Sequence, residues 1–489
     1  MHSRRSLLAV LTVVVAMTGS GCGGPTAPGT ALWPMYHLDP ARSGRDTREP
    51  SFANLHSAWS SGALDGDIYA EPLIDGNLVI VATQNNSLYA FNAGTGAPQW
   101  GPVNLGPPRT LFPPPCGNLP SLGILGTPLI DGGFLYVVAN IQVTPVSFEW
   151  DLFQVHPVTG AVARKTNITP SAVAPPGGSR FDTEFQQQRS ALALSKGNLV
   201  VTWGALSQDC SDFHGFVETI SEATGIPQAQ WNDTFEANNG NPPSAGGGIW
   251  GTSGAAVDSA GNIYVSTGNG AATDPRMYSG DYGDSVLQFS PSLALKSFFA
   301  PGLPEAWWNS NQFDVDLGSL GPSLLPGGML FAIGKGGEGY LLRQSGLPNN
   351  SNPGGGENHQ APVCSGVQDQ AYGGLAVSGN RVFVPCSDGL VAVSIDSSSA
   401  FHNLWYTKLS GGAAPPILAG GLVWTLETFG GDHLYGLRPD SGAIAATFTL
   451  PTTTDHFASP AAGDGMLFVG DGNRVAAFAP SGPRTVSAL

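Results

Sequence analysis

One pattern recurs along most of this chain: a strand of small and apolar residues, a turn, a hydrophobic strand, a third strand and a glycine-containing turn. Residues 71–100 show it in full and end in Trp100. Further copies lie in or near residues 127–160, 190–231, 248–289, 321–342, 373–393, 414–442 and 459–478. Units of four short strands, repeated every roughly 40 to 65 residues, are typical of β-propeller blades, because one blade cannot bury both of its faces alone.

The chain is therefore predicted to be all-β. We expect an eight-bladed β-propeller of four-stranded antiparallel blades over residues 55–480, with seven blades as the alternative if a weak copy is not a blade. The last copy stops after its third strand, and residues 55–59 form an isolated β-rich stretch before the first copy. We expect Leu55 to Trp59 to supply the missing outer strand, which would close the ring and remove its open edge. Residues 481–489 would be a C-terminal tail.

Residues 248–269 are the most informative copy. Ala255 and Val257 precede the turn 258–262, and Ile263 to Val265 follow it, so two antiparallel strands are expected. A polar cluster that ends in Asn269 comes directly after the second strand. Side chains in that position can point into a shared cleft.

Composition agrees with many short strands and excludes some partners. The 489 residues include 67 Gly and 40 Pro, and only 11% are charged. The formal net charge is -16, and the only adjacent basic residues are the pairs Arg4-Arg5 and Arg164-Lys165. A nucleic-acid partner is not expected, because phosphate contacts need clustered Lys and Arg.

The first residues predict export. Arg4-Arg5 precede an apolar run, residues 7–17, that is too short to span a bilayer, and small residues lead to Cys22. Residues 1–22 resemble a bacterial lipoprotein signal, although Gly19 stands where that motif usually has Leu. The resemblance implies a lipid anchor at Cys22 as the membrane attachment, a linker and N-terminal extension over residues 23–54, and a periplasmic or extracellular location on the outer membrane. Simple secretion is the alternative.

Four cysteines remain if Cys22 carries lipid: Cys116, Cys210, Cys364 and Cys386. Three disulfide pairings are possible in an oxidising compartment, and Cys364 with Cys386 is the most local. Four separate buried thiols are the alternative.

Residues 88–100, LYAFNAGTGAPQW, resemble the pyrroloquinoline-quinone (PQQ) enzyme repeat in their third strand, glycine turn and final Trp. The resemblance extends over about residues 55–480 and implies the propeller of the quinoprotein alcohol dehydrogenase-like superfamily. In this repeat, tryptophans dock each blade on the next, a role expected here for Trp59, Trp100, Trp231 and Trp405. The same repeat builds dehydrogenases, scaffold lipoproteins and secreted propellers, so it does not fix the activity.

The resemblance also implies candidate site residues. Trp250 matches the indole that forms the floor under the quinone, Asn269 matches a Ca²⁺ ligand, and Lys335 matches a basic residue beside the quinone oxygens. A docking Trp, a turn Asn and an exposed loop Lys are the alternatives.

Three departures weigh against turnover. Asn311 stands where the family has its aspartate base, and a neutral amide accepts no proton. Asp314 is the candidate base in its place, with Asp316 as the alternative. The disulfide between adjacent cysteines that many of these dehydrogenases carry over the quinone is absent, since no two cysteines here are neighbours. No glutamate before His214 matches the one that completes the family's calcium site.

We therefore predict an exported, lipid-anchored PQQ-repeat-like propeller that serves as a binding or scaffold module. Its partner would be a small-molecule ligand or an envelope protein on the propeller face. The alternative is a PQQ- and calcium-dependent dehydrogenase that oxidises alcohols or aldoses.

Overall fold

The computed structural model describes residues 31–110, 119–171, 181–206, 213–234, 246–270, 282–301, 315–348, 358–365, 370–428 and 430–481. Strands dominate these residues. They contain no α-helix, and their one 3-10 turn is η3 (Leu317–Ser319). None of them belongs to a helix with the length and apolarity that a membrane crossing requires.

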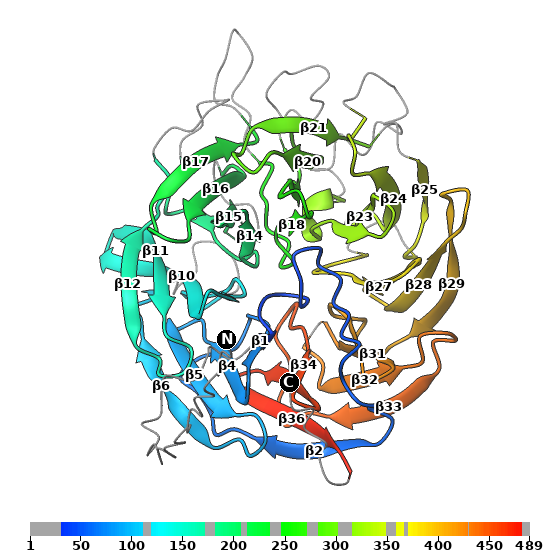
Figure 1. The fold of residues 1–489 in the computed structure, drawn as a ribbon, viewed down its shortest axis with the longest axis horizontal. Helices are drawn as coiled ribbons and strands as arrows, with labels where there is room; N and C mark the ends of the chain where they lie inside the picture. Colours follow the sequence, from blue (N-terminus) through cyan, green and yellow to red (C-terminus); the bar gives the residue numbers. More distant parts are fainter. Residues whose placement is uncertain are drawn as a thin grey trace, which may run out of the picture.

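Eight four-stranded antiparallel blades form a closed ring (Figure 1). The prediction of an all-β, eight-bladed propeller is confirmed, and the seven-bladed alternative is wrong. Blades 1 to 4 consist of β3 (Leu73–Asp75), β4 (Leu78–Ala82), β5 (Ser87–Asn92) and β6 (Pro98–Asn104); β9 (Leu129–Asp131), β10 (Phe134–Thr144), β11 (Ser147–Val155) and β12 (Val162–Asn167); β14 (Ala193–Ser195), β15 (Asn198–Ala205), β16 (Phe216–Ser221) and β17 (Pro227–Asn232); and β18 (Ala256–Val257), β19 (Ile263–Ser266), β20 (Val286–Phe289) and β21 (Leu295–Phe299).

Blades 5 to 8 follow in the same order. They consist of β22 (Ser323–Leu325), β23 (Met329–Ile333), β24 (Glu338–Arg343) and β25 (His359–Pro362); β26 (Ala376–Ser378), β27 (Arg381–Cys386), β28 (Gly389–Ile395) and β29 (Phe401–Lys408); β30 (Ile417–Ala419), β31 (Leu422–Leu426), β32 (His433–Leu437) and β33 (Ile444–Thr449); and β34 (Ala461–Gly463), β35 (Met466–Asp471), β36 (Arg474–Pro480) and β2 (Leu55–Ser60). Four short strands lie outside this scheme: β1 (Ala31–Trp33), β7 (Arg109–Thr110), β8 (Ser121–Leu122) and β13 (Gln186–Gln187).

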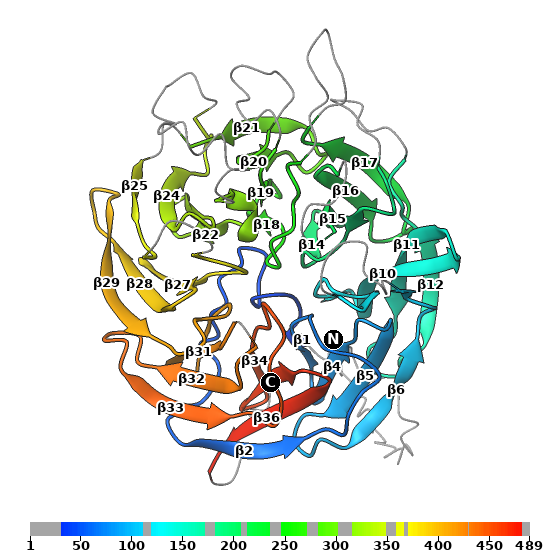
Figure 2. The same cartoon turned by 180° about the vertical axis from the view of Figure 1, so that it is seen from behind.

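The N-terminal strand closes the ring, as predicted. β2 pairs antiparallel with β36, with Leu55 opposite Pro480 and Ser60 opposite Ala476. The blue strand β2 and the red strand β36 therefore lie side by side in blade 8 (Figure 2). Because the outer edge of β36 is paired in this way, no blade is left incomplete.

The predicted hairpin in residues 248–269 is also confirmed. β18 pairs with β19 through Ala256 opposite Tyr264 and Val257 opposite Ile263. Asp258 holds the turn, because its carboxylate accepts hydrogen bonds from the backbone nitrogen and the Nδ2 of Asn262, at 2.8 and 2.7 Å. Gly261 supplies the positive φ of 88° that the turn needs.

Tryptophans dock neighbouring blades, as the repeat implied. Nε1 of Trp59, Trp100 and Trp405 donates to a carbonyl oxygen of the next blade, at Ala93, Pro157 and Pro439, over 2.8, 2.9 and 3.0 Å. Trp231 packs instead on Phe289 of blade 4, with ring centroids 4.8 Å apart.

Blade 2 uses an arginine for the same purpose. Arg164 of β12 donates from its two terminal nitrogens to the carbonyl oxygens of Ala223 and Glu222 in blade 3, both at 2.8 Å. The long stem and flat guanidinium of Arg cover the next turn much as an indole does.

The segment before β2 shows no periodicity in the sequence, yet it crosses the centre of the ring (Figure 1). β1 pairs with the inner strand β3. Beyond it, five carbonyl oxygens of the segment accept backbone N–H groups at the inner strands of blades 2, 4, 5, 6 and 7, at 2.7 to 3.0 Å; these carbonyls belong to Pro34, Pro40, Ala41, Ser43 and Gly44. The segment therefore satisfies inner edges that no other strand pairs.

Arg42 and His37 of this segment are buried, as is Glu71, which follows β2. Arg42 donates to the carbonyl oxygens of Ala255, Tyr36 and Leu192 at 2.9, 3.0 and 2.9 Å. Glu71 Oε1 accepts from the His37 backbone nitrogen at 2.8 Å. Burial raises the pKa of Glu71 to about 7 and lowers the pKa of His37 to about 3, because the charged forms lose hydration.

Cys364 and Cys386 form a disulfide, the most local of the predicted pairings. The alternative of four separate thiols is therefore wrong for these two. Cys22, Cys116 and Cys210 lie outside the described residues.

Candidate functional site

Each blade has two ends, which define two faces of the ring. The top face carries the loops between the second and third strands of each blade and the connections to the next blade; the bottom face carries the turns between the first and second strands. Trp250 precedes β18, Asn269 follows β19, and Lys335 follows β23. All three candidate residues therefore lie on the top face, and we call their surroundings the axial site.

The structure brings Trp250 and Lys335 together. The Lys335 ammonium lies 4.9 Å from the centroid of the Trp250 ring, a distance at which a cation is attracted to an indole face. Trp250 is half-buried, and Lys335 is 9% exposed.

Asp316 completes this pair. Its Oδ2 atom lies 3.0 Å from the Lys335 ammonium, and its side chain is fully buried. The Lys335 backbone nitrogen also donates to the Asp316 carbonyl oxygen at 2.9 Å. Asp314, the candidate base, lies outside the described residues, so the carboxylate that the structure locates beside Lys335 is that of Asp316.

Glycines allow the three loops to meet. A Cβ atom at Gly268 would lie 3.2 Å from Trp250 Nε1 and 3.3 Å from Asp316 Oδ1, so the indole edge and the carboxylate face the same point. A Cβ atom at Gly334 would strike the Asp316 carbonyl oxygen. The loops around Trp250, Asp316 and Lys335 could not approach this closely with larger residues.

Asn269 lies next to Gly268 and is half-buried. Its carbonyl oxygen accepts from the Gly247 backbone nitrogen at 2.7 Å. The described residues do not assemble three His, Cys, Asp or Glu side chains around it. Calcium at Asn269 therefore stays a prediction.

Three more aromatic side chains surround Trp250. Ring centroids of Tyr372 and Phe457 lie 6.5 and 6.2 Å from that of Trp250, tilted by 54° and 52°, and His456 packs on both of these neighbours. Neither ring is parallel to the indole, so neither stacks on it as a planar ligand would. Sequence reasoning missed these residues, because single aromatics in irregular loops give no periodic signal.

A second cation belongs to this cluster. The guanidinium carbon of Arg189 lies 4.2 Å from the Phe457 ring centroid. Burial lowers the pKa of Arg189 to about 10, and burial together with Arg189 lowers the pKa of His456 to about 4. At neutral pH the cluster therefore contains two cations and a neutral imidazole.

Asp455 directly precedes His456 in the chain. Burial raises the pKa of Asp455 to about 7, and the nearby Asp67 adds to the rise. A carboxyl group with this pKa exchanges its proton near neutral pH.

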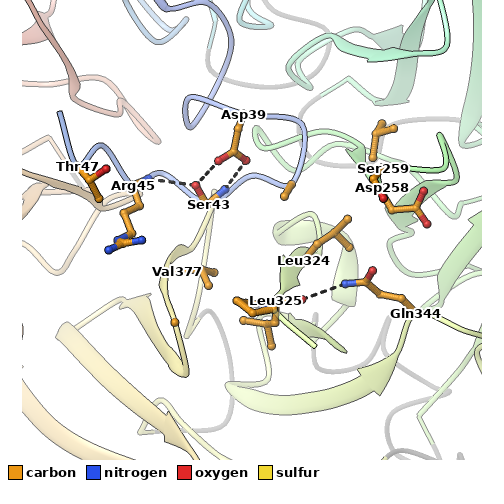
Figure 3. Close-up of a pocket in the computed structure, with 14 residues that line it drawn as sticks. Asp39, Ser43, Arg45, Thr47, Asp258, Ser259, Leu324, Leu325, Gln344 and Val377 are labelled. Atoms are coloured by element: carbon orange, nitrogen blue, oxygen red, sulfur yellow. Dashed lines mark hydrogen bonds between the residues drawn. The ribbon is translucent and has the colours of Figure 1, made fainter. Parts of the chain in front are cut away.

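A pocket of about 430 Å³ lies on the bottom face (Figure 3). Its walls are residues of the N-terminal segment, such as Asp39 and Arg45, and the turns that contain Asp258 and Pro326. None of the predicted site residues lines it. Both of its carboxylates hold local turns, since Asp39 accepts from Ser43 and Asp258 from Asn262. The chemistry therefore gathers at the axial site, not at this pocket.

The residues of the axial site fit a planar, anionic ring. The indole face offers apolar contact, and two cations lie beside the aromatic rings. PQQ has this shape and charge, so Trp250, Lys335 and Arg189 could hold it.

Comparison with known proteins agrees with the fold. The family model described as outer membrane protein assembly factor BamB matches residues 57–115. No curated protein sequence matches the chain. Among solved structures, the quinohemoprotein alcohol dehydrogenase from Comamonas testosteroni is similar over 94% of this chain and 82% of its own, with a TM-score of 0.65 and 14% identity.

Two further structures are similar. The europium-containing methanol dehydrogenase covers 92% of this chain and 98% of its own, with a TM-score of 0.64 and 14% identity. BamB from Moraxella catarrhalis is similar over 88% of this chain and 98% of its own, with a TM-score of 0.53 and 12% identity. At these identities the likeness concerns the fold and leaves the activity open. This chain is a β-propeller with the fold of the quinohemoprotein alcohol dehydrogenase and the europium-containing methanol dehydrogenase, and its residues 57–115 match the BamB family model.

Proposed function

We propose that this protein is an exported, lipid-anchored binding module that holds a planar, anionic small molecule of the quinone class at its axial site. The observation that carries this proposal is the Lys335 ammonium, 4.9 Å from the centroid of the half-buried Trp250 ring. A flat ring can stack on the indole while its oxygens meet the ammonium.

Each residue would have a distinct role in binding. Trp250 would be the floor, and Lys335 would neutralise ligand oxygens. Asp316 would orient Lys335, because its carboxylate lies 3.0 Å from the ammonium. Arg189, beside the Phe457 ring of the aromatic cluster, would add a second positive charge on the top face. PQQ, when bound, supplies an o-quinone that accepts a hydride.

Two further features support export. The Cys364–Cys386 disulfide is stable in an oxidising compartment, as in the periplasm. The first 22 residues resemble a lipoprotein signal that ends at Cys22.

Binding can be tested with PQQ as the probe. We expect the mature protein to bind PQQ with a change in quinone absorbance and in tryptophan fluorescence. Trp250→Ala and Lys335→Met should each weaken binding at least about tenfold, as loss of one strong contact does. Trp405→Phe is the matched control, since Trp405 docks blade 6 on blade 7 away from the axial site. Unchanged affinity in both site variants would remove the axial site as the binding site.

A working dehydrogenase is the second candidate. The observation in its favour is that the Asp316 carboxylate and the Trp250 indole edge face the same point. The ion pair with Lys335 opposes it, because a neighbouring cation makes a carboxylate a weaker proton acceptor.

Turnover distinguishes the two functions. Dye-linked oxidation of alcohols and aldoses should be measured in the presence of PQQ and Ca²⁺, and Asp314→Asn should be compared with Asp316→Asn. Activity lost in only one of these variants would identify the base. PQQ binding without oxidation supports a binding module, and absence of PQQ binding supports a scaffold for an envelope protein instead.

A further inference from the structure

We propose that a divalent transition metal ion of the Zn²⁺ class binds on the top face of blade 7, between Glu427, Asp432 and His433. Glu427 follows β31, and His433 is the first residue of β32. One ligand atom from each of the three side chains lies within 4.8 Å of the others. This is the only such group of three among the residues that the structure describes.

The distances suit adjacent ligands of one metal ion. His433 Nδ1 lies 3.1 Å from Glu427 Oε2 and 2.7 Å from Asp432 Oδ1. Two ligands that are each about 2.1 Å from a tetrahedral Zn²⁺ ion are about 3.4 Å apart. The three atoms therefore need only small movements to share a metal ion.

The donor chemistry selects the class of metal. An imidazole nitrogen and two carboxylate oxygens suit Zn²⁺, whereas Ca²⁺ and Mg²⁺ prefer oxygen ligands alone. The side chains of Asp432 and His433 are 45% and 34% exposed, so water can reach the metal and complete its coordination. Glu427 is 4% exposed and supplies the buried side of the site.

Surrounding groups hold the ligands in place. Glu427 Oε1 accepts from Ser410 Oγ at 2.5 Å and from the Tyr435 hydroxyl at 3.1 Å. Oε2 accepts from the backbone nitrogens of Asp432 and His433 at 3.1 and 3.2 Å, which fixes it 3.1 Å from His433 Nδ1. The His433 ring stacks on Tyr435, with centroids 5.7 Å apart and planes at 14°. Such supporting contacts orient ligands before the metal arrives.

The same loop supports the axial site. The Glu427 and Thr428 carbonyl oxygens accept from Thr454 Oγ1 and His456 Nδ1, both at 2.9 Å. A metal ion at the loop would therefore stiffen the support of His456 and its neighbour Phe457. This consequence rests on the proposed function, whereas the metal site itself does not.

Calorimetric titration of the chelator-treated mature protein with Zn²⁺ tests the proposal. We expect one site, with affinity at least about tenfold weaker in both His433→Ala and Asp432→Asn. His402→Ala is the control, because His402 is an exposed histidine on β29 of blade 6. Asp432 is half-exposed, so Asp432→Asn should fold even if His433→Ala does not.

Two results would overturn the proposal: no Zn²⁺ binding by the wild-type protein, or equal Zn²⁺ affinity in the wild type and Asp432→Asn. Trp250→Ala should keep full Zn²⁺ affinity. A wild-type protein that binds Zn²⁺ but not PQQ would contradict the proposed function and leave the metal site standing.

Discussion

Arg42 donates from Nε to the carbonyl oxygen of Ala255 at 2.9 Å, although 213 residues separate the two in sequence. Nη1 and Nη2 donate to the carbonyl oxygens of Tyr36 and Leu192, so each nitrogen of the guanidinium has a buried acceptor. The N-terminal segment is therefore fixed inside the channel of the ring and contacts blades 3 and 4 there.

Arg42→Met should destabilise the protein by roughly 3 kcal/mol, because it leaves three buried carbonyl oxygens without this donor. Arg45→Met is the control. Arg45 is exposed and should change stability by no more than about 0.5 kcal/mol. Urea denaturation measures both, and equal effects would mean that the buried hydrogen bonds contribute little.

Gly96→Ala should disturb the closure of the ring. Gly96 has φ of 69°, and an added Cβ would lie 2.6 Å from the Trp59 ring that docks blade 8 on blade 1. Gly76→Ala is the matched control. Gly76 has a similar positive φ of 57°, but no atom lies within 4 Å of an added Cβ. We expect a cost of about 1 kcal/mol at Gly76 and about 2 kcal/mol more at Gly96. Thermal unfolding of both variants checks this, and similar melting temperatures would contradict the docking role.

The effects of substitutions at Lys335 and Asp316 on the free energy of unfolding should be coupled. Lys335→Met removes the ion-pair partner of a fully buried carboxylate and should cost about 3 kcal/mol. Adding Asp316→Asn should recover part of that loss, since the neutral amide is cheaper to bury. A double-mutant cycle by chemical denaturation measures the coupling. Strictly additive losses would mean that the two side chains do not interact in solution.

Glu71→Gln should change how stability depends on pH. Burial raises the pKa of Glu71 from 4.5 to about 7, so between these values the folded chain holds a proton that the unfolded chain has released. The contribution of Glu71 to the free energy of unfolding therefore falls by up to about 3 kcal/mol as the pH rises from about 4.5 to 7.

Gln keeps an oxygen for the Trp33 indole and His37 backbone donors, so the variant isolates the charge. Its stability relative to wild type should increase from pH 5 to pH 8, as followed by melting temperature. A constant difference across this range would show that Glu71 is not protonated in the folded protein.

Loss of the Cys364–Cys386 disulfide should loosen the Lys335 loop. The cysteines are 22 residues apart, and a crosslink over such a loop stabilises by about 3 kcal/mol. The Gln370 backbone nitrogen, within the crosslinked segment, donates to the Lys335 carbonyl oxygen at 2.8 Å. A double Ser variant should therefore unfold at lower denaturant and exchange the Gln370 amide hydrogen faster. Unchanged exchange would separate the disulfide from the Lys335 loop.

The sequence by itself determined the ring. Each blade is built from strands that are neighbours in the chain, so alternation, turns and period predict the pairing locally. The eighth copy lacks a strand and residues 55–59 lack a partner, which was enough to predict their pairing across the whole chain. The docking role of Trp100 followed from its place in the repeat.

Only the tertiary structure decided what fills the channel and which side chains meet on the top face. Arg42, Asp316, Arg189 and the group around Glu427 lie in aperiodic segments, where no pattern predicts a neighbour. Their contacts depend on how the closed ring brings loops from separate blades to one axis. Ladder pairing is a property of the local backbone, whereas contact between loops is a property of the assembled ring, and for that reason the sequence predicted the first and not the second.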